Sequence, residues 1–225
     1  MAERREQSEP RYRLIVFDWD GTLIDSAASI VECIRQASHD LGLAVPSAER
    51  ASHVIGLGLH DALRIAVPDL HADQTMAFVA RYRAHFLARE DAMQLFAGVR
   101  EVLDMLRVRG HRLAIATGKS RRGLERALDA SGLRDHFVGS RCADETQPKP
   151  HPAMLNELLA EFDVAASTAL MIGDTSHDLQ MARDANVDAV AVSYGAHPES
   201  ALRAHAPVAC LDSVAALNGW LTQNA

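Results

Sequence analysis

Two aspartates, Asp18 and Asp20, stand two residues apart in the segment Asp18-Trp-Asp20-Gly-Thr22. They directly follow Leu14-Ile-Val-Phe17, an apolar run that is typical of a strand buried on both faces. An Asp-Gly pair after a strand is commonly only a turn. Phosphoryl transfer through an enzyme, however, needs a nucleophilic oxygen and a proton donor for the leaving alcohol. Two carboxylates in different environments can supply both, so this pair is a candidate catalytic centre.

A second acidic pair, Asp174 and Asp178, lies in Gly173-Asp174-Thr-Ser-His-Asp178, between a buried apolar run and a helical pattern. One aspartate at a helix start needs no functional explanation, because it caps the helix and favours its dipole. Two at this spacing beyond a strand are more typical of a hard-cation site, and oxygen ligands favour Mg²⁺. The sequence therefore predicts a magnesium site here.

Lysine occurs only twice, as Lys119 and Lys149, whereas every other basic side chain is arginine. Thr117-Gly-Lys119 follows an apolar run and offers a hydroxyl and backbone N–H groups that could hold phosphate oxygens, although alone it could be a strand-ending turn. Lys149 stands between two prolines, which restrict the backbone before a helix and suit a fixed positive charge.

The elements that must position these residues alternate between strands and helices. Apolar runs at 14–17, 113–116, 169–172 and 189–192 predict buried strands, and amphipathic segments between them predict helices. This order predicts an α/β fold with a doubly wound, Rossmann-like parallel sheet. Ligands of such sheets bind beyond the carboxyl ends of the strands, where all of the polar motifs above are placed.

The stretch 25–94 breaks the alternation and reads as helices only, which predicts a helical cap domain inserted after the first strand. The predicted organisation is an α/β catalytic core at 12–24 and 95–225, the cap at 25–94, and a solvated, disordered tail at 1–11.

Composition narrows the class of protein. The formal charge of −7, with no basic run beyond Arg121-Arg122, argues against a nucleic-acid partner. No run approaches the roughly 18 apolar residues of a membrane span, and three widely spaced cysteines fit a reducing cytoplasm. A zinc site is not expected from the eleven histidines, because His53 and His60 lie seven residues apart and no His-x-x-x-His pair occurs. The sequence gives no indication of oligomeric state.

Taken in order, the motifs resemble the haloacid dehalogenase superfamily. The resemblance rests on Asp18-x-Asp20-Gly-Thr22, Thr117, Lys149-Pro and Gly173-Asp174-x-x-x-Asp178, which span nearly the whole chain. The cap position and the segments 56–63 and 95–99 resemble the phosphoglycolate phosphatase-like branch.

The resemblance implies a role for each matched position. Asp18 is expected to be the nucleophile and to form an aspartyl-phosphate, and Asp20 to be the general acid and base. Mg²⁺ is expected to be bound by Asp18, the main-chain carbonyl of Asp20 and Asp174. Asp178 is expected either to bind the ion or to orient the groups that surround it. Thr117 is expected to hold phosphoryl oxygens, and Lys149 to offset charge.

Substrate contacts are expected from Trp19 and Gly118 in the core and from Gly56, His60 and Arg64 in the cap. The glycines of the loop starting at Gly56 allow close approach to a ligand. Arg64 could pair with a substrate carboxylate or be a solvated arginine. Gly118 and Asn186 depart from the family pattern, since relatives often carry Asn or Ser at the first position and glycine is expected at the second.

The expected activity is magnesium-dependent hydrolysis of a small phosphate monoester, with 2-phosphoglycolate as the candidate substrate. Sugar phosphates and nucleoside monophosphates stay open. A β-phosphoglucomutase-like phosphomutase or a nucleotidase is the enzymatic alternative, and a non-enzymatic binding module on the same fold is the alternative from another class. Asp20 argues against dehalogenation. The absence of lysine from 25–94 argues against Schiff-base phosphonate cleavage.

Overall fold

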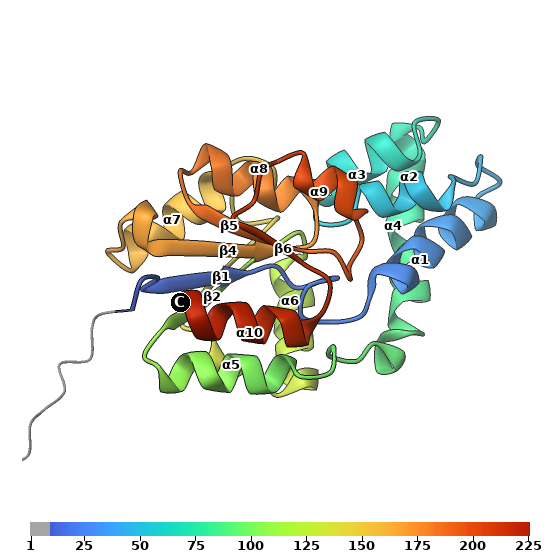
Figure 1. Ribbon diagram of the computed structural model, residues 1–225. Helices are drawn as coiled ribbons and strands as arrows, with labels where there is room; N and C mark the ends of the chain where they lie inside the picture. The colour runs from blue at the N-terminus through green and yellow to red at the C-terminus, as the bar shows by residue number, and fades with distance from the viewer. Residues whose placement is uncertain (1–9) are drawn as a thin grey trace, which may run out of the picture.

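The computed structural model describes residues 10–225. Within them, a parallel six-stranded sheet has the strand order β3-β2-β1-β4-β5-β6 (Figure 1). Its strands are β1 (Leu14–Phe17), β2 (Arg112–Thr117), β3 (Gly139–Cys142), β4 (Ala169–Gly173), β5 (Asp188–Val192) and β6 (Ala209–Leu211). The predicted doubly wound α/β fold and its four predicted strands are confirmed.

The edge strands β3 and β6 were not predicted from the sequence. β3 consists of Gly-Ser-Arg-Cys, and three of its four residues are only partly buried. β6 has three residues, all partly buried. β3 has neither the continuous apolar run nor the alternation that marks a strand in a sequence, whereas β6 lies in the apolar run Val208-Ala-Cys-Leu211, which is only four residues long.

Helices cover both faces of the sheet. Ile15, Phe17 and Ile115 point to the face covered by α5 (Val99–Val108), α6 (Arg121–Ser131) and α10 (Val214–Asn224). Leu14 and Val16 point to the other face, which is covered by α7 (Ala153–Glu161), α8 (Ser176–Asp184) and α9 (Glu199–Arg203). Because successive side chains of a strand alternate between faces, an all-apolar β1 is buried on both sides.

A helical cap lies beyond the carboxyl ends of the strands (Figure 1). It contains α1 (Ala27–Asp40), α2 (Ala48–His53), α3 (Leu59–Ala66) and α4 (Thr75–Leu87), with short 3-10 turns at Ala72–Gln74 and Glu90–Ala92. These helices pack around an apolar cluster of their own, separate from the two clusters on the sheet. The inserted helical cap is therefore present.

Two adjacent chain segments connect the cap to the core. Ile24 and Leu95 form an isolated antiparallel bridge, and the N–H of Asp25 donates to the carbonyl oxygen of Gln94 at 2.9 Å. The exact boundaries at 24/25 and 94/95 stay a prediction.

Most of the predicted tail, residues 1–9, lies outside the described residues. Arg11 was also assigned to the tail, but its guanidinium donates to Asp188 Oδ2 at 3.2 Å. Tyr12 is fully buried. None of the helices in the described part of the chain is long and apolar enough to span a membrane.

Candidate active site

Three buried carboxylates meet at the carboxyl edge of the sheet. Asp18 directly follows β1, and its N–H donates to the carbonyl oxygen of Ile172 in the neighbouring strand β4 at 2.9 Å. Asp174 directly follows β4, and Asp178 lies in the first turn of α8. One carboxylate oxygen from each of these aspartates lies within 4.8 Å of the other two. Parallel pairing of β1 with β4 thus brings together residues that are distant in sequence.

The two carboxylate oxygens of Asp178 have different partners, one at the start of α8 and the other in the acidic cluster. Its Oδ2 accepts hydrogen bonds from the N–H and the hydroxyl of Thr175, at 3.0 and 2.6 Å, in a capping box at the start of α8. Its Oδ1 lies 2.6 Å from Lys149 Nζ. Asp178 is therefore both a helix cap and a member of the acidic cluster.

Lys149 is the cation of this cluster. Its Nζ lies 2.7 Å from Asp18 Oδ1 as well as 2.6 Å from Asp178 Oδ1, and its side chain is completely buried. Burial disfavours the charged ammonium, but the carboxylates of Asp178 and Asp18 outweigh burial and raise the pKa of Lys149. Burial raises the pKa of Asp18 well above its usual range, although Lys149 opposes this shift.

Asp174 is held by two donors. The Thr22 hydroxyl donates to Oδ1 and the Ala196 N–H donates to Oδ2, both at 2.7 Å. Burial, followed by the charge of Asp178, raises the pKa of Asp174 to about 7. Gly21 allows the backbone to approach this carboxylate, because a Cβ at that position would lie 2.2 Å from Asp174 Oδ2.

The acidic cluster fits a hard divalent cation. Among the described residues no hydrogen-bond donor reaches the buried Oδ2 atom of Asp18, and its Oδ1 faces Lys149. A buried carboxylate oxygen without a donor is costly unless a cation compensates it. Asp18, Asp174 and Asp178 offer only oxygen ligands, which suits Mg²⁺ better than a softer metal.

Asp20 is separate from the cluster and faces the cap. The hydroxyl of Ser26 donates to its Oδ1 at 2.8 Å, and Lys119 Nζ lies 3.0 Å from its Oδ2. Lys119 also lies 4.8 Å from the ring centroid of Phe86 in the cap. The sequence predicted no role for the Lys119 side chain or for Ser26. The rarity of lysine in the sequence could have pointed to a functional role for Lys119, whereas nothing in the sequence marked Ser26.

A cap loop approaches the core at Gly118. The Thr117 hydroxyl accepts the Lys119 N–H at 3.2 Å and keeps its own proton to donate. A Cβ at Gly118 would lie 2.7 Å from the carbonyl oxygens of both Gly56 and Leu57. This contact explains why glycine stands at a position where the family pattern has a larger residue.

A cavity of about 530 Å³ runs from Asp20 and Lys119 into the cap. Gly56 and Gly118, both predicted to contact substrate, line it. Most of the other lining side chains are apolar, and they come from α1, the 54–66 segment and α4. Arg83 and Arg122, for which no ion pair or hydrogen bond is found among the described residues, also line the cavity.

Three predicted substrate contacts are not brought to this cavity. His60 and Arg64 do not line it. The Arg64 side chain is 71% exposed and lies 3.6 Å from Asp61. The indole of Trp19 is fully buried in the core, where it packs edge-on against Phe137. The alternation of residues after β1 turns the Trp19 side chain into the core, away from this cavity. A substrate contact through the Trp19 backbone stays a prediction.

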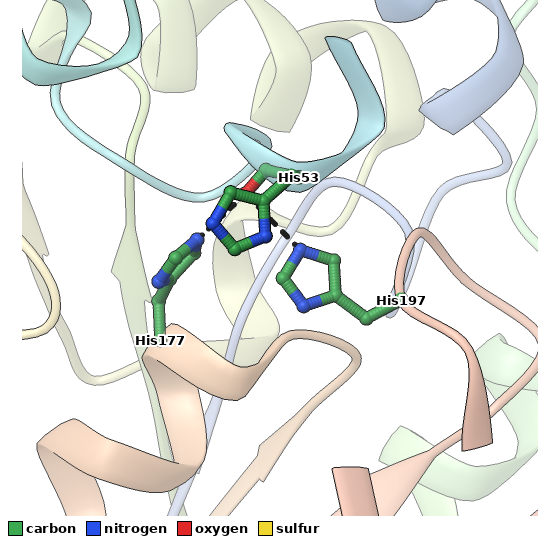
Figure 2. Close-up of side chains that lie close together, drawn as sticks. All are labelled: His53, His177 and His197. Carbon is green, nitrogen blue, oxygen red and sulfur yellow. Dashed lines mark hydrogen bonds between the residues drawn. The ribbon is translucent and has the colours of Figure 1, made fainter. Parts of the chain in front are cut away.

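Three histidines meet where the cap contacts the core (Figure 2). His53 ends α2, His177 lies in the first turn of α8, and His197 lies in the loop after β5. The Nε2 atoms of His177 and His197 lie 2.7 and 3.2 Å from the carbonyl oxygen of His53 (Figure 2). In the tautomer with Nε2 protonated, both rings donate to this oxygen.

The same rings have a spacing that could suit a metal ion, since one nitrogen from each lies within 4.8 Å of the others. However, Nδ1 of His197 accepts the Ser176 N–H at 3.1 Å, so both nitrogens of this ring already have protein partners. A metal would have to displace those bonds. The arrangement favours a hydrogen-bonded latch between cap and core, made by His177 and His197 on the His53 carbonyl.

The sequence pattern of the haloacid dehalogenase-like hydrolases matches residues 15–192, which include every residue of the acidic cluster. The chain belongs to this family. It is 34% identical over 213 residues to the "Probable phosphatase IndB" of Dickeya dadantii, covering 92% of each chain. It is 30% identical over 222 residues to a "Phosphoglycolate phosphatase" of Nitrosococcus oceani, covering 94% of this chain and 97% of that protein.

A third relative is larger than this haloacid dehalogenase-like chain. The "Tyrosine-protein kinase PtkA" of Mycobacterium tuberculosis is 35% identical over 185 residues, which are 81% of this chain and 62% of that protein. Among solved structures, a predicted phosphoglycolate phosphatase from Haemophilus somnus 129pt has a TM-score of 0.81 at 25% identity, covering 92% of this chain and 96% of that one. These matches support the phosphoglycolate phosphatase-like branch of the family.

Proposed function

We propose that this chain is a magnesium-dependent phosphatase that hydrolyses a small phosphate monoester through an aspartyl-phosphate on Asp18. The observation that carries the proposal is the buried cluster in which Asp18, paired with Lys149, lies beside Asp174 and Asp178. A reducing cytoplasm is the expected compartment, and a small phosphorylated metabolite is the expected partner.

Asp18, Asp174 and Asp178 would hold Mg²⁺, together with the backbone carbonyl of Asp20. When bound, Mg²⁺ supplies positive charge that neutralises the phosphate oxygens and the carboxylates around them. Lys149 adds a fixed cation against Asp18 Oδ1. The residues of this site alone leave a net negative charge, which would repel a dianionic ester.

Asp18 would attack phosphorus, forming the new P–O bond as the bond to the leaving alcohol breaks. Asp20 faces the cavity and would give its proton to that alcohol oxygen, and would later take a proton from the water that hydrolyses the aspartyl-phosphate. Ser26 and Lys119 fix the orientation of the Asp20 carboxyl group. The Thr117 hydroxyl and the Gly118 N–H would hold the phosphoryl oxygens.

The names of relatives make 2-phosphoglycolate the reference substrate. Because Arg64 and His60 do not line the cavity, neither supports this choice. Arg122 is better placed, since it lines the cavity and has no ion-pair partner among the described residues. A carboxylate on the leaving group could pair with it.

The experiment that tests the proposed function is a release assay for inorganic phosphate. The panel contains 2-phosphoglycolate, hexose phosphates, nucleoside monophosphates and p-nitrophenyl phosphate, each with and without Mg²⁺. We expect magnesium-dependent release from at least one ester and trapping of phosphate on Asp18, found by mass spectrometry after acid quench. Isomerisation of a hexose phosphate without release would instead support the phosphomutase. Absence of both reactions across the panel would contradict the proposal.

A further inference from the structure

The cavity above Asp20 is larger and more apolar than a two-carbon acid requires. Its volume of about 530 Å³ lies within the range of sites that enclose drug-sized ligands, roughly 300–1,000 Å³. Apolar side chains from three cap segments form most of the wall, among them Ile34, Ile55, Leu57, Tyr82 and Phe86. The glycolate group could contact only a small part of this wall.

The apolar wall begins at the catalytic end of the cavity. Lys119 Nζ lies 3.0 Å from Asp20 Oδ2 and 4.8 Å from the ring centroid of Phe86. In the proposed mechanism Asp20 protonates the leaving oxygen, and the Lys119 ammonium contacts both this carboxylate and the face of the Phe86 ring. The leaving group would therefore pass this cation and then meet the apolar wall of the cap.

Two of the lining residues leave apolar surface open to solvent. Leu59 is 41% exposed and Leu87 is 47% exposed, and both line this cavity. Large exposed aliphatic side chains that gather at one cavity are typical of a surface that a ligand covers. The cost of exposing them to water falls when an apolar group fills the space between them.

We propose that the preferred substrate is a phosphate monoester whose alcohol carries a large apolar or aromatic group, which fills the cap cavity while the phosphate lies at Asp18. This inference rests on the proposed function, because it places the leaving oxygen at Asp20. Arg83 and Arg122 line the same cavity, so an alcohol with a further anionic group remote from the phosphate is compatible with it.

The test compares kcat/KM for ethyl, butyl, hexyl and 2-phenylethyl phosphate, whose primary alcohols are similar leaving groups, with that for 2-phosphoglycolate, in the full chain with Mg²⁺. Each buried methylene should raise kcat/KM about fourfold. The hexyl and 2-phenylethyl esters should therefore exceed both ethyl phosphate and 2-phosphoglycolate by tenfold or more. Equal values along the series, or a preference for 2-phosphoglycolate over every apolar ester, would overturn the inference.

Ala62→Phe in α3 would fill the cavity, because Ala62 lines it and is only partly buried. This variant should lose at least tenfold more kcat/KM for 2-naphthyl phosphate than for ethyl phosphate. Ala84→Phe is the matched control, since Ala84 is exposed on α4 and does not line the cavity. An equal effect of Ala62→Phe on both esters would contradict the assigned cavity.

Binding separates this inference from the proposed function. Calorimetry with the Asp18→Asn protein and 2-naphthyl phosphate reports on the cavity without turnover. If no ester is hydrolysed by the unmodified chain but 2-naphthyl phosphate binds and Ala62→Phe abolishes that binding, the function is wrong and the cavity assignment holds. If esters are hydrolysed and the apolar series shows no preference, the function holds and the cavity assignment is wrong.

Discussion

A Cβ added at Gly118 would lie 2.7 Å from the carbonyl oxygen of Gly56, so the core and the cap touch backbone to backbone close to Asp18. Gly118→Ala should force the cap loop away from the site. We expect kcat/KM to fall at least tenfold, with little change in unfolding temperature, because the contact is between the cap and the core rather than within either. Gly219→Ala is the control, since a Cβ there meets no atom within 4 Å. Unchanged kinetics for Gly118→Ala would show that this contact is not needed during turnover.

Asp18→Asn should lower kcat by at least about a thousandfold, because an amide cannot form the aspartyl-phosphate. The metal-free protein should not be destabilised. Burial raises the pKa of Asp18, which means that the charged carboxylate is disfavoured there, and the substitution removes one of the three clustered carboxylates. Steady-state kinetics measure the loss of turnover, and thermal unfolding measures the stability of the metal-free protein. Retention of more than a few per cent of turnover, in protein shown by mass spectrometry to be free of deamidation, would contradict a covalent role.

Lys149→Met should destabilise the metal-free protein by about 3–5 kcal/mol, because it leaves Asp18 and Asp178 buried without their cation. Denaturant unfolding measures this loss. Mg²⁺ should restore part of the stability, since it would supply positive charge to the same carboxylates. A variant as stable as the unmodified chain without metal would mean that the ion pairs are offset by the cost of burying the lysine.

Magnesium should stabilise the protein more at pH 8 than at pH 6. The pKa of Asp174 rises from its ordinary value of 3.8 to about 7 in the folded, metal-free protein. Between these two pKa values the folded state holds a proton on Asp174 that the unfolded state has lost. The stability that this proton contributes is therefore complete below pH 4 and is lost as pH rises through 7. Mg²⁺ binds the ionised carboxylate and therefore competes with that proton.

The measurement is the shift in unfolding temperature caused by Mg²⁺ at the two pH values. Burial lowers the pKa of His177 and His197, which removes stability at acid pH, but this contribution is common to samples with and without metal. Asp174→Asn should show a small shift at both pH values. A shift that is equal at pH 6 and pH 8 in the unmodified chain would argue against proton competition at this site.

The latch should control how often the cap leaves the core. His177→Ala and His197→Ala each remove a donor to the His53 carbonyl, and the double variant removes both. We expect faster amide hydrogen exchange in residues 47–58 and a several-fold lower kcat/KM. His39→Ala, at an exposed histidine near the end of α1 in the cap, is the control. If the double variant exchanges like the control, the ring contacts do not hold the cap.

Part of the acidic cluster was predictable, because Asp18 and Asp174 each directly follow an apolar strand and parallel strands bring their carboxyl ends to one edge of the sheet. That β1 and β4 are neighbours in the sheet is known only from the structure. The latch could not be predicted, because His53 lies in the cap whereas His177 and His197 lie in the core. The contact among the three histidines depends on how the cap docks on the core, and hydrophobic periodicity in the sequence does not predict that docking.

The same limit explains the cap residues. Gly56, with φ at +88°, lines the cavity, and its contact with substrate stays a prediction. Arg64, in the second turn of α3, points elsewhere because the rotation of a short helix relative to the core is set by packing. The sequence showed which chemistry Arg64 could perform and carried no information about its direction.

The paired connections between cap and core restrict how the enzyme opens. Since Ile24 bridges Leu95 and the Asp25 N–H binds the Gln94 carbonyl, the two crossing segments are held side by side at one place. The cap and the core are therefore joined at one paired connection rather than at two separate ones. The cap should therefore rotate as a rigid body about this single hinge rather than slide along the core. In such a rotation the Gly56–Gly118 contact and the His53 latch would separate together.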